Sequence, residues 1–229
     1  MSAATIIDTE IHIELDRATL IGDLVIPEHA HGVVAFAHGS GSGRQSPRNR
    51  FVAGRLQESG LATLLVDLLT LQEEDVDRYS GHLRFNIGLL SDRMTGVSDW
   101  LCHDERTSSL PIGCFGASTG AGAALVAAAR RKGSIHAVVS RGGRPDLANE
   151  ALPAVRASTL LIVGGDDRTV LRLNRDALKQ VGATIKELAV VPGATHLFEE
   201  PGKLEEVAQL AAHWFSKHLE GHCNSPEGV

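Results

Sequence analysis

The feature of this sequence that most constrains its fold is a regular alternation of short apolar runs with segments of helical spacing. Continuous apolar runs are typical of parallel strands that helices cover on both faces. Strands separated by helices form right-handed βαβ units. We therefore predict an α/β fold with a mostly parallel central sheet. The runs lie at residues 32–37, 62–66, 111–115, 137–140, 158–163 and 187–191.

Two further strands are predicted before this region, and they pair in antiparallel fashion. Ile7, Ile11 and Ile13 alternate with polar neighbours, and a second apolar run over 20–26 stops at Pro27. Helical spacing recurs between the strands and at the end of the chain. The predicted helices lie at residues 51–59, 87–101, 118–131, 171–181 and 203–219.

The length and composition fit one globular domain. The chain has 229 residues, of which 43% are hydrophobic and 22% are charged. A chain of this size can bury a large core without disulfides or metals. No repeat or linker interrupts the pattern, so we expect one domain over residues 1–220 and a frayed tail over 221–229. Residues 68–85 are acidic and have no clear period, which fits a loop or a small cap.

Charge and cysteine content narrow the class of protein. The net charge of −6 disfavours nucleic acid and anionic membranes as partners. No apolar run approaches the ~18 residues of a transmembrane helix. The first residues are acidic rather than basic, so we expect no signal peptide. The cysteines Cys102, Cys114 and Cys223 form no CxxC pair, which fits a reduced, cytoplasmic protein without a metal site. We expect a small-molecule substrate, and both a monomer and a dimer stay open.

A possible nucleophile lies between a predicted strand and a predicted helix. Residues 116–120 read Gly-Ala-Ser-Thr-Gly, which is the pattern G-x-S-x-G in the context that it requires. The turn is so tight that a Cβ at Gly116 or Gly120 would press on neighbouring backbone, and the hydroxyl of Ser118 is then exposed at the apex. The helix that begins there points N–H groups toward a developing oxyanion. The structural alternative is a glycine-rich turn in which Ser118 caps the helix.

A base and an acid follow Ser118 in the expected chain order. A serine hydroxyl needs a base with a pKa near ~6.5 and a carboxylate that orients it, and in this fold the order is Ser, Asp or Glu, His. Asp166 and Asp167 follow the strand at 158–163, and His196 follows the strand at 187–191. All lie at the same edge of the predicted sheet. The alternatives are a solvated loop histidine and an aspartate that caps a turn.

An acyl-transfer site also needs two backbone donors for the oxyanion. One is predicted to be the N–H of Thr119, directly after the nucleophile. The other is predicted in the loop His-Gly-Ser-Gly at 38–41, with the N–H of Ser40 as first choice and Gly41 as the alternative. His38 precedes this loop, and we expect it to make a structural hydrogen bond rather than act as the base.

Arginines flank these loops and would suit an anionic acyl substrate. Arg44 follows the glycine-rich loop, and Arg141 and Arg144 follow a predicted strand, so each could bind a carboxylate or a phosphate. The alternative is a salt bridge with an acid such as Asp146. The glycine-rich loop does not fit a dinucleotide site, because Arg44 and Ser46 stand where G-x-G-x-x-G requires glycine.

Four segments together resemble an α/β-hydrolase of the dienelactone-hydrolase-like family: HGSG at 38–41, GASTG at 116–120, GGDDRTV at 164–170 and PGATHLF at 192–198. The resemblance spans nearly the whole chain and implies about eight strands with little or no lid. It also implies Asp167 as the acid, since the family places a valine two or three residues later and Val170 fits. The chain departs from the family in one respect: dienelactone hydrolases proper use cysteine where Ser118 stands.

The resulting hypothesis is a serine hydrolase that cleaves a small carboxylic ester through an acyl-enzyme, without a metal or an organic cofactor. Ser118 attacks, His196 transfers the proton, and Asp167 orients the imidazole. Acyl transfer, thioester cleavage and peptide cleavage by the same three residues stay open. So does a non-catalytic binding module that keeps the hydrolase fold.

Overall fold

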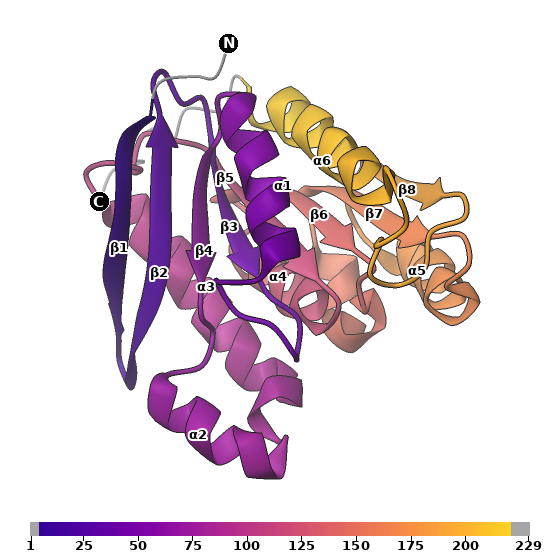
Figure 1. The fold of residues 1–229 in the computed structure, drawn as a ribbon, viewed down its shortest axis with the longest axis horizontal. Coiled ribbons are helices and arrows are strands. Elements are labelled where there is room, and N and C mark those ends of the chain that lie inside the picture. The colour runs from indigo at the N-terminus through magenta and orange to yellow at the C-terminus, as the bar shows by residue number, and fades with distance from the viewer. Residues whose placement is uncertain (1–4, 221–229) are drawn as a thin grey trace.

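The computed structural model describes residues 5–220, and its centre is one mixed sheet of eight strands (Figure 1). The strands are β1 (Thr5–Leu15), β2 (Ala18–Pro27), β3 (Val33–Ala37), β4 (Ala62–Val66), β5 (Ile112–Ala117), β6 (Ile135–Arg141), β7 (Ser158–Gly164) and β8 (Lys186–Val191). Their order in the sheet is β1-β2-β4-β3-β5-β6-β7-β8. The predicted mostly parallel sheet is confirmed: β3 to β8 are parallel, and β1 and β2 are antiparallel additions at one edge.

Helices cover both faces of the sheet (Figure 1). The α-helices are α1 (Pro47–Glu58), α2 (Leu71–Ser80), α3 (Ile87–His103), α4 (Thr119–Arg130), α5 (Arg168–Gln180) and α6 (Lys203–Leu219), and the short 3₁₀ segments are η1 (Leu83–Phe85) and η2 (Pro145–Ala154). α1 and α6 pack together on one face, and α3, α4 and α5 lie on the other. The crossovers bring all the loops that follow the parallel strands to one edge of the sheet.

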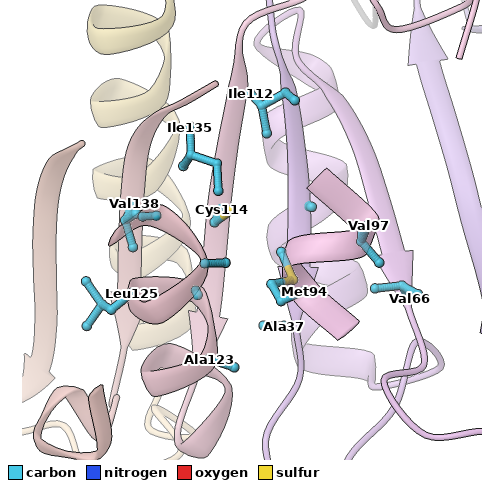
Figure 2. Packing of buried hydrophobic residues seen from close by; sticks show 14 of the residues in the cluster. Ala37, Val66, Met94, Val97, Ile112, Cys114, Ala123, Leu125, Ile135 and Val138 are labelled. Atoms are coloured by element: carbon cyan, nitrogen blue, oxygen red, sulfur yellow. The ribbon is translucent and has the colours of Figure 1, made fainter. Parts of the chain in front are cut away.

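Two large hydrophobic clusters hold the layers together. The cluster beneath α3 and α4 contains Met94 and Val97 of α3 together with Ala37 and Val66 of the sheet (Figure 2). The cluster beneath α1 and α6 contains aromatic side chains such as Phe115. Each of these side chains is almost fully removed from solvent, and burial of a large apolar side chain contributes about 1.5–3 kcal/mol. The continuous apolar runs of the sequence are therefore strands buried on both faces.

Helix α1 begins four residues before the predicted start at residue 51. Ser46 caps it, because its hydroxyl accepts the backbone N–H of Asn49 at 3.4 Å, and Pro47 occupies the first helical position. Proline suits that position since its missing N–H has no intrahelical partner there. The capping signal, rather than apolar spacing, sets the start of this helix.

Residues 68–85 fold into a small helical cap made of α2 and η1. Thr70 and Glu73 form a capping box at the start of α2, where each side chain accepts the other residue's backbone N–H. The buried carboxylate of Asp77 accepts the N–H of Leu83 at 2.6 Å and the Nε–H of Arg84 at 2.5 Å. These bonds fold η1 back onto α2. The cap projects beyond the end of the sheet (Figure 1).

Three sequence predictions concern the C-terminal tail, membrane-spanning helices and the segment before β7. The predicted frayed tail at 221–229 lies outside the described residues. Within the described range, every helix is too short or too polar to cross a bilayer. The segment 145–154, for which the sequence pattern predicts no element, forms η2 against α4 and α5.

Candidate active site

Ser118 occupies a strained backbone turn between β5 and α4. Its φ of 50° and ψ of −120° lie outside the regions that non-glycine residues favour, at a cost of about 1–3 kcal/mol. Two neighbours hold this conformation: the N–H of Ser118 donates to the carbonyl of Arg141 at 3.2 Å, and its own carbonyl accepts the N–H of Arg144 at 2.9 Å. The turn presents the hydroxyl at the edge of the sheet where the strand-end loops meet.

The two glycines of the turn are needed for close backbone packing. A Cβ on Gly116 would lie 2.7 Å from the backbone nitrogen of Ala121, and a Cβ on Gly120 would lie 2.5 Å from the carbonyl oxygen of His38. Both distances are shorter than any real Cβ contact. The steric reason for G-x-S-x-G is therefore present at both positions.

The structure brings Ser118, His196 and Asp167 together. His196 Nδ1 lies 2.7 Å from Asp167 Oδ2, and Nε2 lies 3.4 Å from Ser118 Oγ. A carboxylate can only accept, so Nδ1 carries the proton and Nε2 is free to take one. The second carboxylate oxygen of Asp167 accepts the N–H of Val170 at 3.3 Å and so caps α5. Asp166, the alternative acid, is exposed. Within residues 5–220, its carboxylate makes no hydrogen bond to His196 or to Ser118.

Two acidic residues that the sequence pattern does not single out hold the loop that carries His196. Glu200 accepts the N–H of Thr195 at 3.1 Å and its hydroxyl at 2.6 Å. Glu199 accepts from Arg48 Nη1 at 2.9 Å and so ties this loop to α1. The pair of Arg48 and Glu199 has no local sequence signal, since the two residues are 151 apart along the chain.

The two predicted oxyanion donors belong to residues next to the nucleophile in the chain or in space. Gly39, which precedes Ser40, packs so closely that a Cβ there would lie 3.1 Å from Ser118 Cβ. Thr119 is the first residue of α4 and is buried. Across the described chain, no acceptor is bonded to the backbone N–H of Ser40 or of Thr119. Gly41, the alternative donor, is exposed with open space around its Cα.

Arg44 ties the oxyanion loop to the neighbouring strands. Its backbone N–H and its Nε donate to the carboxylate of Asp67, at 2.7 and 3.0 Å. Nη1 bonds Asp23, and Nη2 bonds Glu10 at 2.7 Å. The guanidinium therefore already faces three carboxylates, and the desolvation that lowers the pKa of Arg44 is outweighed by these acids, which raise it. This arrangement supports the loop and leaves no free edge of Arg44 for a substrate anion.

The other two predicted anion-binding arginines differ from each other. Arg144 Nε and Nη2 donate to the carboxylate of Asp146 at 2.8 and 2.7 Å. Arg144 therefore forms the salt bridge that is the predicted alternative to anion binding. Arg141 is 8% exposed, and its Nη2 donates to the amide oxygen of Asn49 at 3.4 Å. Burial, reinforced by the charge of Arg48, lowers the pKa of Arg141 to about 10. Nη1 of Arg141 has no partner among the described residues.

Cys114 lies in β5, four residues before Ser118, and is fully buried. Burial raises the pKa of its thiol to about 12. The thiolate form, which is the reactive one, is therefore scarce at neutral pH. Within residues 5–220, no group of three or more His, Cys, Asp or Glu side chains has the arrangement of a metal site.

Comparisons with known proteins place the chain in a family. No family model matches it. A crystal structure of dienelactone hydrolase from Anabaena variabilis is 56% identical, covers 93% of this chain and 99% of its own, and superposes with a TM-score of 0.91. Est1E from Butyrivibrio proteoclasticus is 16% identical and shares the fold, with a TM-score of 0.76 over 91% of this chain and 98% of its own.

Two curated relatives come from strains of Mycobacterium tuberculosis and are provisionally named phosphoribosyl transferases. Each is 54% identical over 214 residues, which is 93% of this chain and 47% of the relative. The chain therefore spans about half the length of the curated relatives it matches. The likeness to the Anabaena protein extends over both chains almost completely, so the chain belongs to the dienelactone-hydrolase-like family of the α/β-hydrolase superfamily.

Proposed function

We propose that this hydrolase is a serine enzyme that cleaves small carboxylic esters through an acyl-enzyme intermediate. The observation that carries the proposal is the chain of two contacts from Asp167 through His196 to Ser118, at 2.7 and 3.4 Å. The comparison with a dienelactone hydrolase supports the same class of reaction.

The mechanism follows from the hydrogen-bond roles of the three residues. Nε2 of His196 accepts the hydroxyl proton as Ser118 Oγ attacks the carbonyl carbon, and Asp167 stabilises the imidazolium that forms. The carbonyl oxygen becomes an oxyanion, for which the N–H groups of Ser40 and Thr119 are the available donors. The imidazolium then protonates the leaving alcohol. Water repeats the sequence on the acyl-enzyme and releases the acid.

Serine suits this site better than the neighbouring cysteine. Cys114 is buried in the sheet with its pKa raised to about 12, whereas the hydroxyl of Ser118 is partly exposed and faces a base. Phosphoribosyl transfer, which the names of the longer relatives suggest, has no matching observation at this site. A strained serine with a base and an acid behind it is an arrangement for acyl transfer.

The test is whether Ser118 forms a covalent adduct and whether turnover depends on it. A fluorophosphonate probe is expected to label the wild-type protein at Ser118, with peptide mass spectrometry to locate the adduct. Hydrolysis of p-nitrophenyl butanoate is expected to fall by at least about 10³-fold in Ser118→Ala. Ser108→Ala, in the loop between α3 and β5, is the matched control. A protein that resists the probe and hydrolyses no aryl ester would overturn the proposal in favour of a binding module.

A further inference from the structure

A cavity of about 340 Å³ opens beside the oxyanion loop. One wall is the loop itself, with Ser40 and Ser42, and the other is the helical cap, with Glu74 of α2 and Arg84 beyond it. Leu69 contributes an apolar patch that is only 6% exposed. Ser40 lines this cavity and also supplies a proposed oxyanion donor, so the cavity is the space beside the oxyanion loop that a substituent of a substrate bound at Ser118 can enter.

The order of the strands decides which part of an ester enters this cavity. Ser118 follows β5, His196 follows β8, and the cavity lies beside the loops that follow β3 and β4. The cavity and His196 are therefore on opposite sides of the nucleophile along the sheet edge, as the positions of α2 and β8 in Figure 1 indicate. The leaving group must reach His196 to be protonated. The acyl group is the substituent that remains for the cavity.

The two arginines that line the cavity both have an acidic partner. Arg84 bonds the buried carboxylate of Asp77, and Arg78 lies 3.4 Å from the exposed carboxylate of Asp75. The carboxylate of Glu74 is half-buried and has no hydrogen bond or ion pair among the described residues. Burial, helped by the charge of Asp67, raises the pKa of Glu74, and this outweighs the opposing effect of His38 and Arg78 in the same cavity. A partly desolvated acceptor without a donor is the group that a ligand can satisfy.

We propose, building on the proposed hydrolase function, that this cavity binds the acyl part of a neutral substrate that carries a hydroxyl group. The hydroxyl donates to Glu74, and the serines of the oxyanion loop offer further polar contacts. The same carboxylate repels an acyl chain that ends in a carboxylate. The three arginines that the sequence pattern suggests for an anion do not line this cavity: Arg44, Arg141 and Arg144 all lie outside its walls.

The experiment compares four p-nitrophenyl esters whose acyl chains have four carbons: butanoate, each of the two enantiomers of 3-hydroxybutanoate, and succinate. The wild-type protein is expected to favour one hydroxybutanoate over butanoate by roughly tenfold in kcat/KM, since a hydrogen bond to a charged acceptor is worth about that factor. Glu74→Leu is expected to bring the ratio close to one, and Glu74→Gln, which keeps an acceptor, to retain part of it. The succinate ester is expected to be the poorest substrate of wild type and to gain in Glu74→Gln.

Glu105→Gln is the matched control, because Glu105 is an exposed acid in the loop after α3 and does not line the cavity. It is expected to keep the wild-type ratios. If Ser118 is labelled and butanoate is cleaved but the hydroxyl gives no advantage, or the succinate ester is preferred, the inference about the acyl group is wrong and the hydrolase function stands. If no ester is cleaved and Ser118 resists the probe, both proposals fail.

Discussion

The imidazole of His38 holds the carbonyl oxygen of Gly39, with 3.0 Å from Nδ1 to the oxygen. Nε2 of the same ring accepts the N–H of Leu68 at 3.0 Å, so Nδ1 carries the proton and donates. Gly39 also accepts the N–H of Ser42 at 3.1 Å. The carbonyl and the N–H of a trans peptide point in opposite directions. Fixing the carbonyl of Gly39 therefore aims the N–H of Ser40 away from the imidazole.

His38→Ala is expected to lower kcat for ester hydrolysis by roughly 10- to 100-fold with little change in KM, because a misaligned oxyanion donor weakens binding of the transition state rather than of the substrate. Steady-state kinetics measure this split. Affinity for a boronic acid, which forms a tetrahedral adduct with a serine, is expected to fall by a similar factor. His103→Ala, at the exposed end of α3, is the control. An unchanged kcat in His38→Ala would show that Ser40 is held without the imidazole.

Two adjacent aspartates provide a matched pair for the acid of the triad. Asp167→Asn is expected to lower kcat by about 10³- to 10⁴-fold, because an amide can donate to Nδ1 and stabilise the wrong tautomer of His196. Asparagine is also a good helix cap, so α5 stays intact. Asp166→Asn is expected to stay within about twofold of wild type, since Asp166 is exposed. Equal losses in the two variants, measured at equal thermal stability, would contradict the assignment.

The sheet, and the approach of Ser118 and His196 to one another, can be predicted from the sequence because both depend on local signals. Apolar runs such as that at 62–66 coincide with strands, and strand ends determine where Ser118 and His196 meet. The chain order of the residues is then enough to bring them to one edge. The choice of Asp167 over Asp166 needs more, since both follow the same strand and only the family resemblance separates them.

The cap and the arginines depend on long-range contacts and are harder to predict. Asp77 looks like any surface acid in the sequence, yet it is buried and organises η1 through Leu83 and Arg84. In the sequence, Arg44 follows a glycine-rich loop and therefore suggests an anion site. Its actual partners are carboxylates that lie 21 to 34 residues away along the chain. Periodicity carries no information about such pairs, so Glu74 gives no signal in the sequence as a cavity residue.

Cys114→Ala is expected to retain fluorophosphonate labelling and kcat within about twofold of wild type, and to lose on the order of 1 kcal/mol of stability from the buried site. Iodoacetamide is expected to leave Cys114 of the folded protein unmodified at pH 7.5, because burial raises the pKa of the thiol to about 12. Mass spectrometry of native and urea-unfolded samples measures the modification. Rapid alkylation of Cys114 with loss of activity would instead indicate a reactive thiol near the site.

Arg141→Met is expected to raise the free energy of unfolding by about 1–3 kcal/mol, because it removes a buried guanidinium that pairs with no carboxylate of residues 5–220. Burial lowers the pKa of Arg141 to about 10 on folding, so above pH 10 the unfolded chain binds more protons than the folded one, and this residue's contribution to stability rises with pH only there. Below pH 10 its penalty is constant, and urea unfolding at pH 7 and 9 is expected to give equal gains. Arg144→Met, which breaks a surface pair with Asp146, is the control and is expected to cost at most about 1 kcal/mol. A loss of stability in Arg141→Met would mean that buried water or a bound anion already compensates the charge.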